Sequence, residues 1–189
     1  SAAAAGLDGG TITPTGASVG TKQGFSIIKY QGNSTAGANI SHGLLEAPKL
    51  MIHKSLDQSR NWYTITTAID GSADYLYLNL TNQANDSAVT VPTSDLMYFT
   101  SSAESNYSGE NYIVYMWHDV PGLQKFGTYQ GTGSGSTSPF IELGFRPALV
   151  VLKSYEGSTS NWVVLDDKRP AYNAANLNTL CWNSNADHD

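Results

Sequence analysis

The residues able to do chemistry are few in this sequence, and they stand apart from one another. Gly16-Ala17-Ser18-Val19-Gly20 has the G-x-S-x-G spacing of a nucleophile elbow. An elbow exposes its serine only at a sharp turn from a strand into a helix. Here Pro14 precedes the segment and a strand-like run, Phe25–Tyr30, follows it. We therefore expect Ser18 to have no catalytic role, and we predict no catalytic residue elsewhere.

Metal-ligating residues show no useful spacing either. Zinc needs several converging nitrogen or sulfur ligands, and calcium needs a full shell of oxygens. No histidine stands in an H-x-H or H-x-x-x-H pair, Cys181 is the only cysteine, and no D-x-D-x-D-G loop occurs. The sequence therefore predicts no metal and no cofactor. The residues considered are His42, His53, His118, His188, Asp166-Asp167 and Asp187-His188-Asp189.

The other polar signals have simpler interpretations. Gly131–Ser136 lacks the lysine and helix start of a phosphate loop and indicates a hairpin loop. The Asn/Ser/Thr-rich composition accounts for five N-x-S/T sequons, at Asn33, Asn39, Asn79, Asn85 and Asn106. The glutamates fall in or beside predicted turns, and no glycosidase pair stands out among them. They are Glu46, Glu104, Glu110, Glu142 and Glu156.

The composition excludes several kinds of partner. Charged residues make up only 14% of the chain, the net charge is −6, and no Lys/Arg run occurs. Proteins that hold nucleic acid or anionic lipid cluster their cations, so we expect neither partner. No apolar stretch is long enough to span a bilayer, so we expect no membrane insertion. The lone cysteine excludes an intrachain disulfide and is compatible with assembly in a reducing bacterial cytoplasm.

The elements that would position any site are short strands rich in Ile, Val, Tyr, Thr and Trp. Gly, Asn, Ser and Pro separate them, and no window has the periodicity of a capped helix. The sequence predicts an all-β fold of β-sandwich units, with a jelly-roll or lectin-like topology. The predicted strands are Phe25–Tyr30, Leu50–Lys54, Trp62–Thr67, Tyr75–Thr81, Leu96–Thr100, Tyr112–His118, Phe126–Tyr129, Phe140–Leu143, Ala148–Lys153, Trp162–Leu165 and Asn178–Trp182.

Two stretches of the chain match each other at a separation near 100 residues, which indicates tandem domains. Tyr30 matches Tyr129 at an offset of 99, Asn61-Trp62 matches Asn161-Trp162 at 100, and Leu80-Thr81-Asn82 matches Cys181-Trp182-Asn183 at 101. We predict a linker, or the tail of a preceding unit, over 1–23, a first unit over 24–122 and a truncated second unit over 123–189. A tryptophan kept in both copies favours the core over a sugar platform, so we expect Trp62 and Trp162 to be buried.

The second unit has no counterpart of Asn111–Trp117, the strongest strand signal of the first. That run is apolar throughout, so we expect a central strand covered on both faces. A sandwich without it keeps an open edge and an uncovered core face. We therefore expect either a longer parent chain or a homo-oligomer, with a trimer favoured.

Several of these residues also carry a family resemblance. Gly24–Tyr30, Ser41-His42-Gly43-Leu44, Asn61-Trp62, Leu78–Asn82 and Asn111–Tyr115 together resemble a repeated domain of unknown function in tail-fibre and other virion proteins of marine bacteriophages, cyanophages especially. The bridge Trp117–Gly127 is similar to the join between successive copies in that family. Glu142-Leu143-Gly144 departs from its usual His-Gly-Leu turn, which weakens any shared role for His42.

The resemblance implies a bacteriophage structural module at the virion surface. We expect a tail fibre or spike that contributes to host attachment, in contact with other virion proteins and with a host glycan or receptor. One alternative is an architectural capsid fibre or decoration protein. Another, which the sequence favours less, is a tailspike enzyme that degrades polysaccharide.

Overall fold

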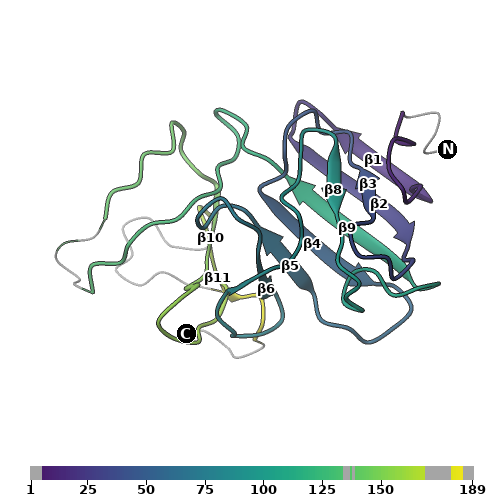
Figure 1. Ribbon diagram of the computed structural model, residues 1–189. Coiled ribbons are helices and arrows are strands. Elements are labelled where there is room, and N and C mark those ends of the chain that lie inside the picture. The colour runs from purple at the N-terminus through teal and green to yellow at the C-terminus, as the bar shows by residue number, and fades with distance from the viewer. Residues whose placement is uncertain (1–5, 134–136, 138, 169–179, 185–189) are drawn as a thin grey trace.

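The computed structural model describes residues 6–133, 137, 139–168 and 180–184. The described residues form strands, turns and loops, and they contain no helix, so none that could cross a membrane. All strand pairs are antiparallel, and the strands are arranged in three sheets (Figure 1). The prediction of an all-β chain is confirmed.

The largest sheet has seven strands and contains most of the first predicted unit. Because every pairing is antiparallel, one face can be buried in a core while the other remains available for contacts elsewhere. The order across the sheet is β1 (Gly16–Gly20), β2 (Phe25–Gln31), β9 (Asn111–Trp117), β4 (Leu50–Ser55), β5 (Tyr63–Thr66), β6 (Asp74–Tyr77) and β7 (Asn85–Asp86).

A two-stranded sheet closes the core over one face of this large sheet. It consists of β3 (Asn39–Ser41) and β8 (Leu96–Tyr98), which lie in front of β2 and β9 in Figure 1. Ile40 and Met97 are fully buried beneath it. The large sheet contributes alternate residues of its central strands to the same cluster, among them Ile28, Tyr30, Met51, Ile65, Tyr112, Val114 and Met116.

Strand β9 lies between β2 and β4, so its predicted central position is confirmed. It pairs with both neighbours over most of its length. The prediction that it is covered equally on both faces is wrong, because burial alternates along it. Tyr112, Val114 and Met116 are completely buried, whereas the residues between them are only half-buried. The apolar run therefore has one core face and one partly covered outer face.

Residues 6–23 are not a linker. Leu7 and Ile12 are 3% and 5% exposed and belong to the core, and Gly16–Gly20 forms β1 against β2. The small residues that indicated a linker let this segment lie flat along the edge of the sheet. Strands predicted at Phe126–Tyr129 and Phe140–Leu143 do not form.

A third sheet contains β10 (Leu149–Leu152), β11 (Val163–Asp166) and β12 (Leu180–Cys181) and lies beside β5 and β6 (Figure 1). The Trp162 indole Nε1 donates to the Tyr77 carbonyl at 3.0 Å. On the large sheet, Ile52, Thr64 and Leu76 form a cross-strand row that faces away from the core, yet they are only 6%, 0% and 3% exposed. This burial, together with the Trp162–Tyr77 bond, indicates that the third sheet packs on the outer face of the large sheet.

The third sheet has the same local hydrogen bonds as β4, β5 and β6. In both, the backbone N–H of a tryptophan donates to the Oδ1 of a downstream asparagine. The Nδ2 of that asparagine in turn donates to the Oδ1 of the asparagine just before the tryptophan. The two distances are 3.0 and 3.0 Å in the first sheet and 2.8 and 3.0 Å in the third. The residues are Asn61, Trp62 and Asn79 in the first and Asn161, Trp162 and Asn183 in the third.

These bonds correct one part of the predicted alignment. Asn183 takes the position of Asn79, 104 residues earlier, so the match of Leu80-Thr81-Asn82 to Cys181-Trp182-Asn183 is three residues out of register. The connection between β11 and β12 is longer than the one between β5 and β6, which a search for identical letters does not detect. The β4 lysine, Lys54, and its counterpart Lys153 each donate to the carbonyl two residues before the tryptophan, at 2.8 and 2.7 Å.

A buried polar chain crosses the core. The Tyr30 hydroxyl donates to the Ser105 carbonyl at 2.6 Å and lies 3.1 Å from His53 Nδ1. Because the hydroxyl proton is used by Ser105, Nδ1 of His53 must donate, which leaves Nε2 as an acceptor without a partner among the described atoms. Burial lowers the pKa of His53 to about 3, so the ring is neutral in the folded protein.

We predict that His53 makes the fold sensitive to mild acid. Its folded pKa lies below the unfolded value of about 6.5, so its contribution to stability is complete above that pH and is lost as the pH falls toward about 3. His53→Phe should flatten the pH dependence of the unfolding free energy between pH 6.5 and about 4, measured by urea denaturation. Glu110→Gln is the control, because Glu110 titrates below its ordinary value of 4.5. An unchanged slope in His53→Phe would contradict the assignment.

Candidate functional site

The serine of the elbow-like motif lies in the middle of a strand. Ser18 is paired with Ile27 in β1, and a tight turn closed by a Gln23 N–H to Gly20 carbonyl bond (3.1 Å) leads directly into β2. A strand–turn–strand segment has neither the sharp nucleophile turn nor the following helix of an elbow.

The three described histidines, His42, His53 and His118, are all buried, and burial, followed by the nearby His118, lowers the pKa of His42. His42 Nε2 is 3.1 Å from the Thr93 carbonyl, and its Nδ1 accepts the Leu44 N–H at 3.2 Å. His118 Nδ1 is 2.7 Å from the Asp119 carbonyl. Within the described part of the chain, no group of three His, Cys, Asp or Glu side chains converges on a point.

The remaining predicted positions are distributed along the chain. Asp166 ends β11 and Asp167 follows it, with its N–H bonded to the Ala148 carbonyl. Gly131–Ser136 lies in a loop of which residues 134–136 fall outside the described residues, as do Asp187, His188 and Asp189. Among the glutamates, Glu104 accepts two bonds from Asn61, and Glu110 forms an ion pair.

The two tryptophans have the same backbone partners but different exposure. Trp162 is 7% exposed, as predicted, whereas Trp62 is 37% exposed, so the prediction of a core position is wrong for Trp62. Both side chains belong to the outer faces of their sheets. Trp162 is buried where the third sheet packs against Tyr77 of the large sheet. Trp62 is only partly covered by the described residues.

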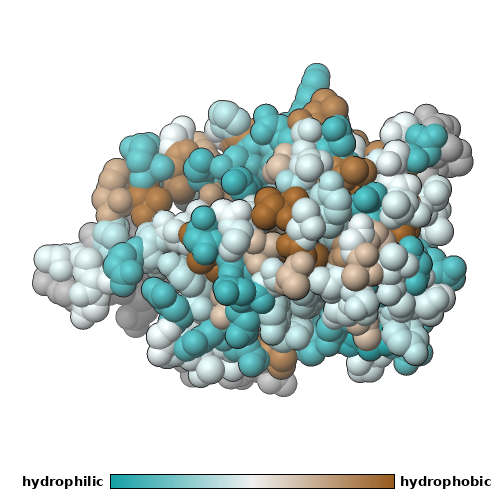
Figure 2. Space-filling view, in the orientation of Figure 1, coloured by the Kyte–Doolittle hydropathy of each residue, from teal (hydrophilic) through white to brown (hydrophobic). Residues whose placement is uncertain are grey.

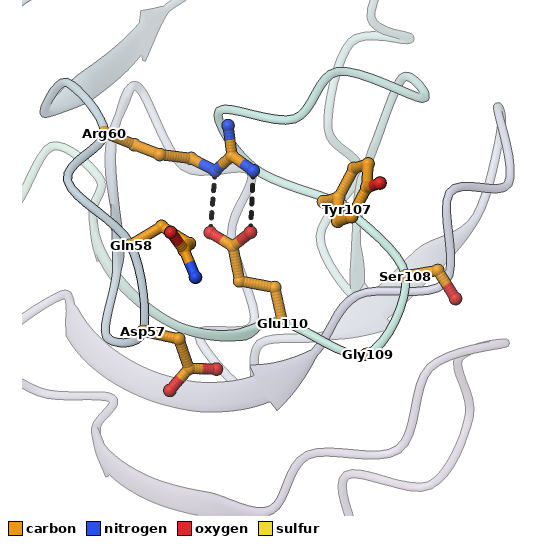
Figure 3. Close-up of a pocket in the computed structure, with 7 residues that line it drawn as sticks. All are labelled: Asp57, Gln58, Arg60, Tyr107, Ser108, Gly109 and Glu110. Atoms are coloured by element: carbon orange, nitrogen blue, oxygen red, sulfur yellow. Dashed lines mark hydrogen bonds and ion pairs between the residues drawn. The ribbon is translucent and has the colours of Figure 1, made fainter.

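A hollow on the described surface opens between two loops (Figure 3). Its volume is about 430 Å³, and one wall comes from the turn after β4 and the other from the loop that leads into β9. The lining side chains are mainly polar. They belong to Asp57, Gln58, Arg60, Tyr107, Ser108, Gly109 and Glu110.

An ion pair forms the floor of this hollow. Arg60 Nε and Nη2 donate to the two Glu110 carboxylate oxygens, each at 2.7 Å, which gives a planar, two-bond contact (Figure 3). Hydrogen bonding to Arg60 lowers the pKa of Glu110 to about 2 and raises the pKa of Arg60 above its usual value. The guanidinium also lies 5.5 Å from the centre of the Tyr107 ring.

Hydrogen bonds, most of them from the buried Asn106 side chain, hold the Tyr107 loop in place. Asn106 is fully buried; its Oδ1 accepts the Asn33 N–H at 2.9 Å, and its Nδ2 donates to the Thr35 and Thr100 carbonyls. The Tyr107 N–H donates to the Tyr112 hydroxyl at 3.1 Å. The loop is thereby anchored to the core strand β9 while the Tyr107 side chain remains exposed.

The opposite wall is anchored to the start of β9. Asp57 Oδ2 accepts both the backbone N–H and the Nδ2 of Asn111, at 2.6 and 2.9 Å. Gly109 has a φ of +79°, a left-handed conformation that favours glycine and turns the loop sharply before the strand. Both walls are therefore fixed relative to one another before any ligand arrives.

The hollow combines a closed ion pair with an exposed aromatic ring. The Arg60 and Glu110 charges are directed at each other, while the 53% exposed Tyr107 ring lies on the wall opposite the polar side chains of Asp57 and Gln58 (Figure 3). Such a mixture can stack on a sugar ring and bond its hydroxyls. Sequence reasoning missed the site because Arg60 and Glu110 are 50 residues apart and match no motif.

We predict that breaking the ion pair destabilises the first unit. Arg60→Met leaves the 5% exposed Glu110 carboxylate without its counter-ion, which should cost about 2 kcal/mol at pH 7, between the values for surface and buried pairs. Because the folded Glu110 pKa is lowered, the pair's contribution is complete above pH 4.5 and is lost as the pH falls through about 2.

The measurement is chemical denaturation of Arg60→Met, Glu110→Gln and the double variant at pH 7 and pH 3. The single-variant losses should not add, and the loss in Arg60→Met should shrink at pH 3. Additive losses that do not change with pH would contradict a direct ionic interaction.

Comparison with known proteins gives one match. No curated protein and no solved structure matches the chain with significance. One family model covers all of it, from residue 1 to residue 189. The chain therefore belongs to the family described as "Domain of unknown function (DUF7483)".

Proposed function

We propose that this chain is a structural and adhesive module of a bacteriophage particle, exposed at the virion surface in a tail fibre or spike. The resemblance of Gly24–Tyr30, Asn61-Trp62 and Asn111–Tyr115 to a repeated virion domain supports this proposal. The acidic net charge of −6 favours a protein partner or a neutral glycan over nucleic acid.

The observation that carries the proposal is the recurrence of one hydrogen-bond set in two parts of the chain. Around Trp62 and Trp162, the same asparagine and lysine bonds hold a three-strand segment of the same register. Recurrent units that stack on one another are a common way to build an extended fibre. On this basis we propose tandem units over 24–122 and 123–189, with residues 6–23 forming part of the first.

The hollow between Tyr107 and Asp57 is the surface through which we propose attachment. Its walls are fixed by hydrogen bonds, so a ligand would not have to order them, and its aromatic and polar groups match the chemistry of a glycan. In the particle the chain would associate with copies of itself, as a trimer, and with other virion proteins. An architectural capsid fibre or decoration protein is the alternative; a polysaccharide-degrading tailspike is less favoured.

Location is tested by labelling phage particles with antibodies against the purified chain and locating the label by electron microscopy. We expect label on tail fibres or spikes. Label on the capsid would favour the architectural alternative, and particles without label would contradict a virion function.

Attachment is tested by competition. The purified chain should reduce adsorption of the phage to its host, and Tyr107→Ala should weaken that inhibition by roughly tenfold if the ring stacks on a sugar. Tyr129→Ala is the matched control, because Tyr129 is 45% exposed but does not line the hollow. Equal inhibition by both variants would contradict a role for the hollow, and sedimentation of the same samples would test the trimer.

A further inference from the structure

We propose that the third sheet is an acceptor for an additional strand, with its site at the free edge of β10 and on the face of the sheet next to that edge. The expected occupant is an extended segment with the residue alternation of β9, supplied by a repeat of this unit that lies outside residues 1–189. This inference rests on the proposed tandem organisation and specifies what kind of segment the second unit would bind.

The first unit provides the template for the edge. There β4 is paired on both sides, with β5 and with β9. β10 is the counterpart of β4, since Leu149 follows Leu50 by 99 residues. Leu149 pairs with Asp166 in β11 just as Leu50 pairs with Thr66 in β5. Among the described strands, β10 pairs with β11 alone, so its other edge has backbone groups available for a strand.

The face beside this edge is also incomplete. In the first unit the corresponding face is sealed in the core, where Met51 and Ile65 are each 2% exposed. Their counterparts Val150 and Leu165 are only half-buried and line a hollow of about 330 Å³. The opposite face is already covered by the first unit, because Val164 on that face is 2% exposed and Trp162 bonds to Tyr77. The free apolar face is therefore the one that would be the core side of a finished unit.

The segment that should cover this face remains exposed as well. Phe140 is 89% exposed and Ile141 is 46% exposed, although their region corresponds to β3 and the turn after it, which close the first core. Figure 2 shows hydrophobic residues gathered on this arm, residues 139–148, at the upper left. A monomer rarely leaves such apolar groups together unless a partner covers them.

The β4–β9 register specifies what the occupant should look like. Val114 pairs with His53 and Met116 with Met51, and both side chains enter the core. Transferred to β10, these two positions fall opposite Leu152 and Val150. The donated strand therefore needs apolar side chains at alternate positions toward the sheet, with aromatic residues tolerated between them, as in Asn111–Trp117.

The test uses the full chain and a labelled synthetic peptide with the sequence of Asn111–Trp117, flanked by lysines for solubility. Fluorescence anisotropy should show saturable binding, and a scrambled peptide of the same composition should not bind. Hydrogen exchange measured by mass spectrometry should slow in β10 when the peptide is present. Equal binding of the scrambled peptide, or slowing at β1 or β7 in place of β10, would overturn the proposal.

Two matched variants locate the site. Val150→Glu places a carboxylate under the incoming strand and should weaken peptide binding by roughly tenfold or more. Val19→Glu makes the same change on β1, an end strand of the large sheet, and should leave binding unchanged. Circular dichroism checks that both variants keep the wild-type fold. Unweakened binding in Val150→Glu overturns this inference alone, because antibody labelling of particles tests the virion function independently.

Discussion

The structure depends on the double pairing of β9. This strand joins β2 on one side and β4 on the other, and without it the large sheet separates into two parts with no strand pairing between them. Its inward side chains, Tyr112, Val114 and Met116, are completely buried at the centre of the core. Glu110, just before the strand, pairs with Arg60 in the floor of the hollow, so the same strand also positions the candidate site.

The third sheet shows what remains when this pairing is missing. β10, β11 and β12 keep the register and the asparagine bonds of their counterparts, which indicates that those features are local to a three-strand segment. Among the residues that the structure describes, they do not build a core of their own. Instead the outer side of the segment docks on the first unit through Trp162 and Tyr77, while its inner side stays half-exposed. In this fold the strand register and the asparagine bonds of a three-strand segment can thus form without a core beneath that segment.

Sequence patterns predicted the parts of the structure that depend on local alternation. The apolar run at β9 and the short β-branched runs at β4 and β5 were placed correctly, because period-two burial leaves a trace in the residues themselves. β1 was missed, since Gly16–Gly20 is composed of small residues typical of loops and pairs only because β2 offers an edge. The exposure of Trp62 and the pairing of Arg60 with Glu110 depend on distant segments, and neither has a signal in the sequence.

The long separation between β2 and β9 also dictates when this protein can fold during its synthesis. Phe25 pairs with Trp117, so the sheet stays unfinished until the ribosome has added the 92 residues that separate them. At ribosomal rates of about 5–20 residues per second, that interval lasts on the order of ten seconds. During it β2 and β4 both have open edges, and topologies of this kind fold slowly. Chaperone binding to the nascent chain would matter most in this window, before residue 117 emerges.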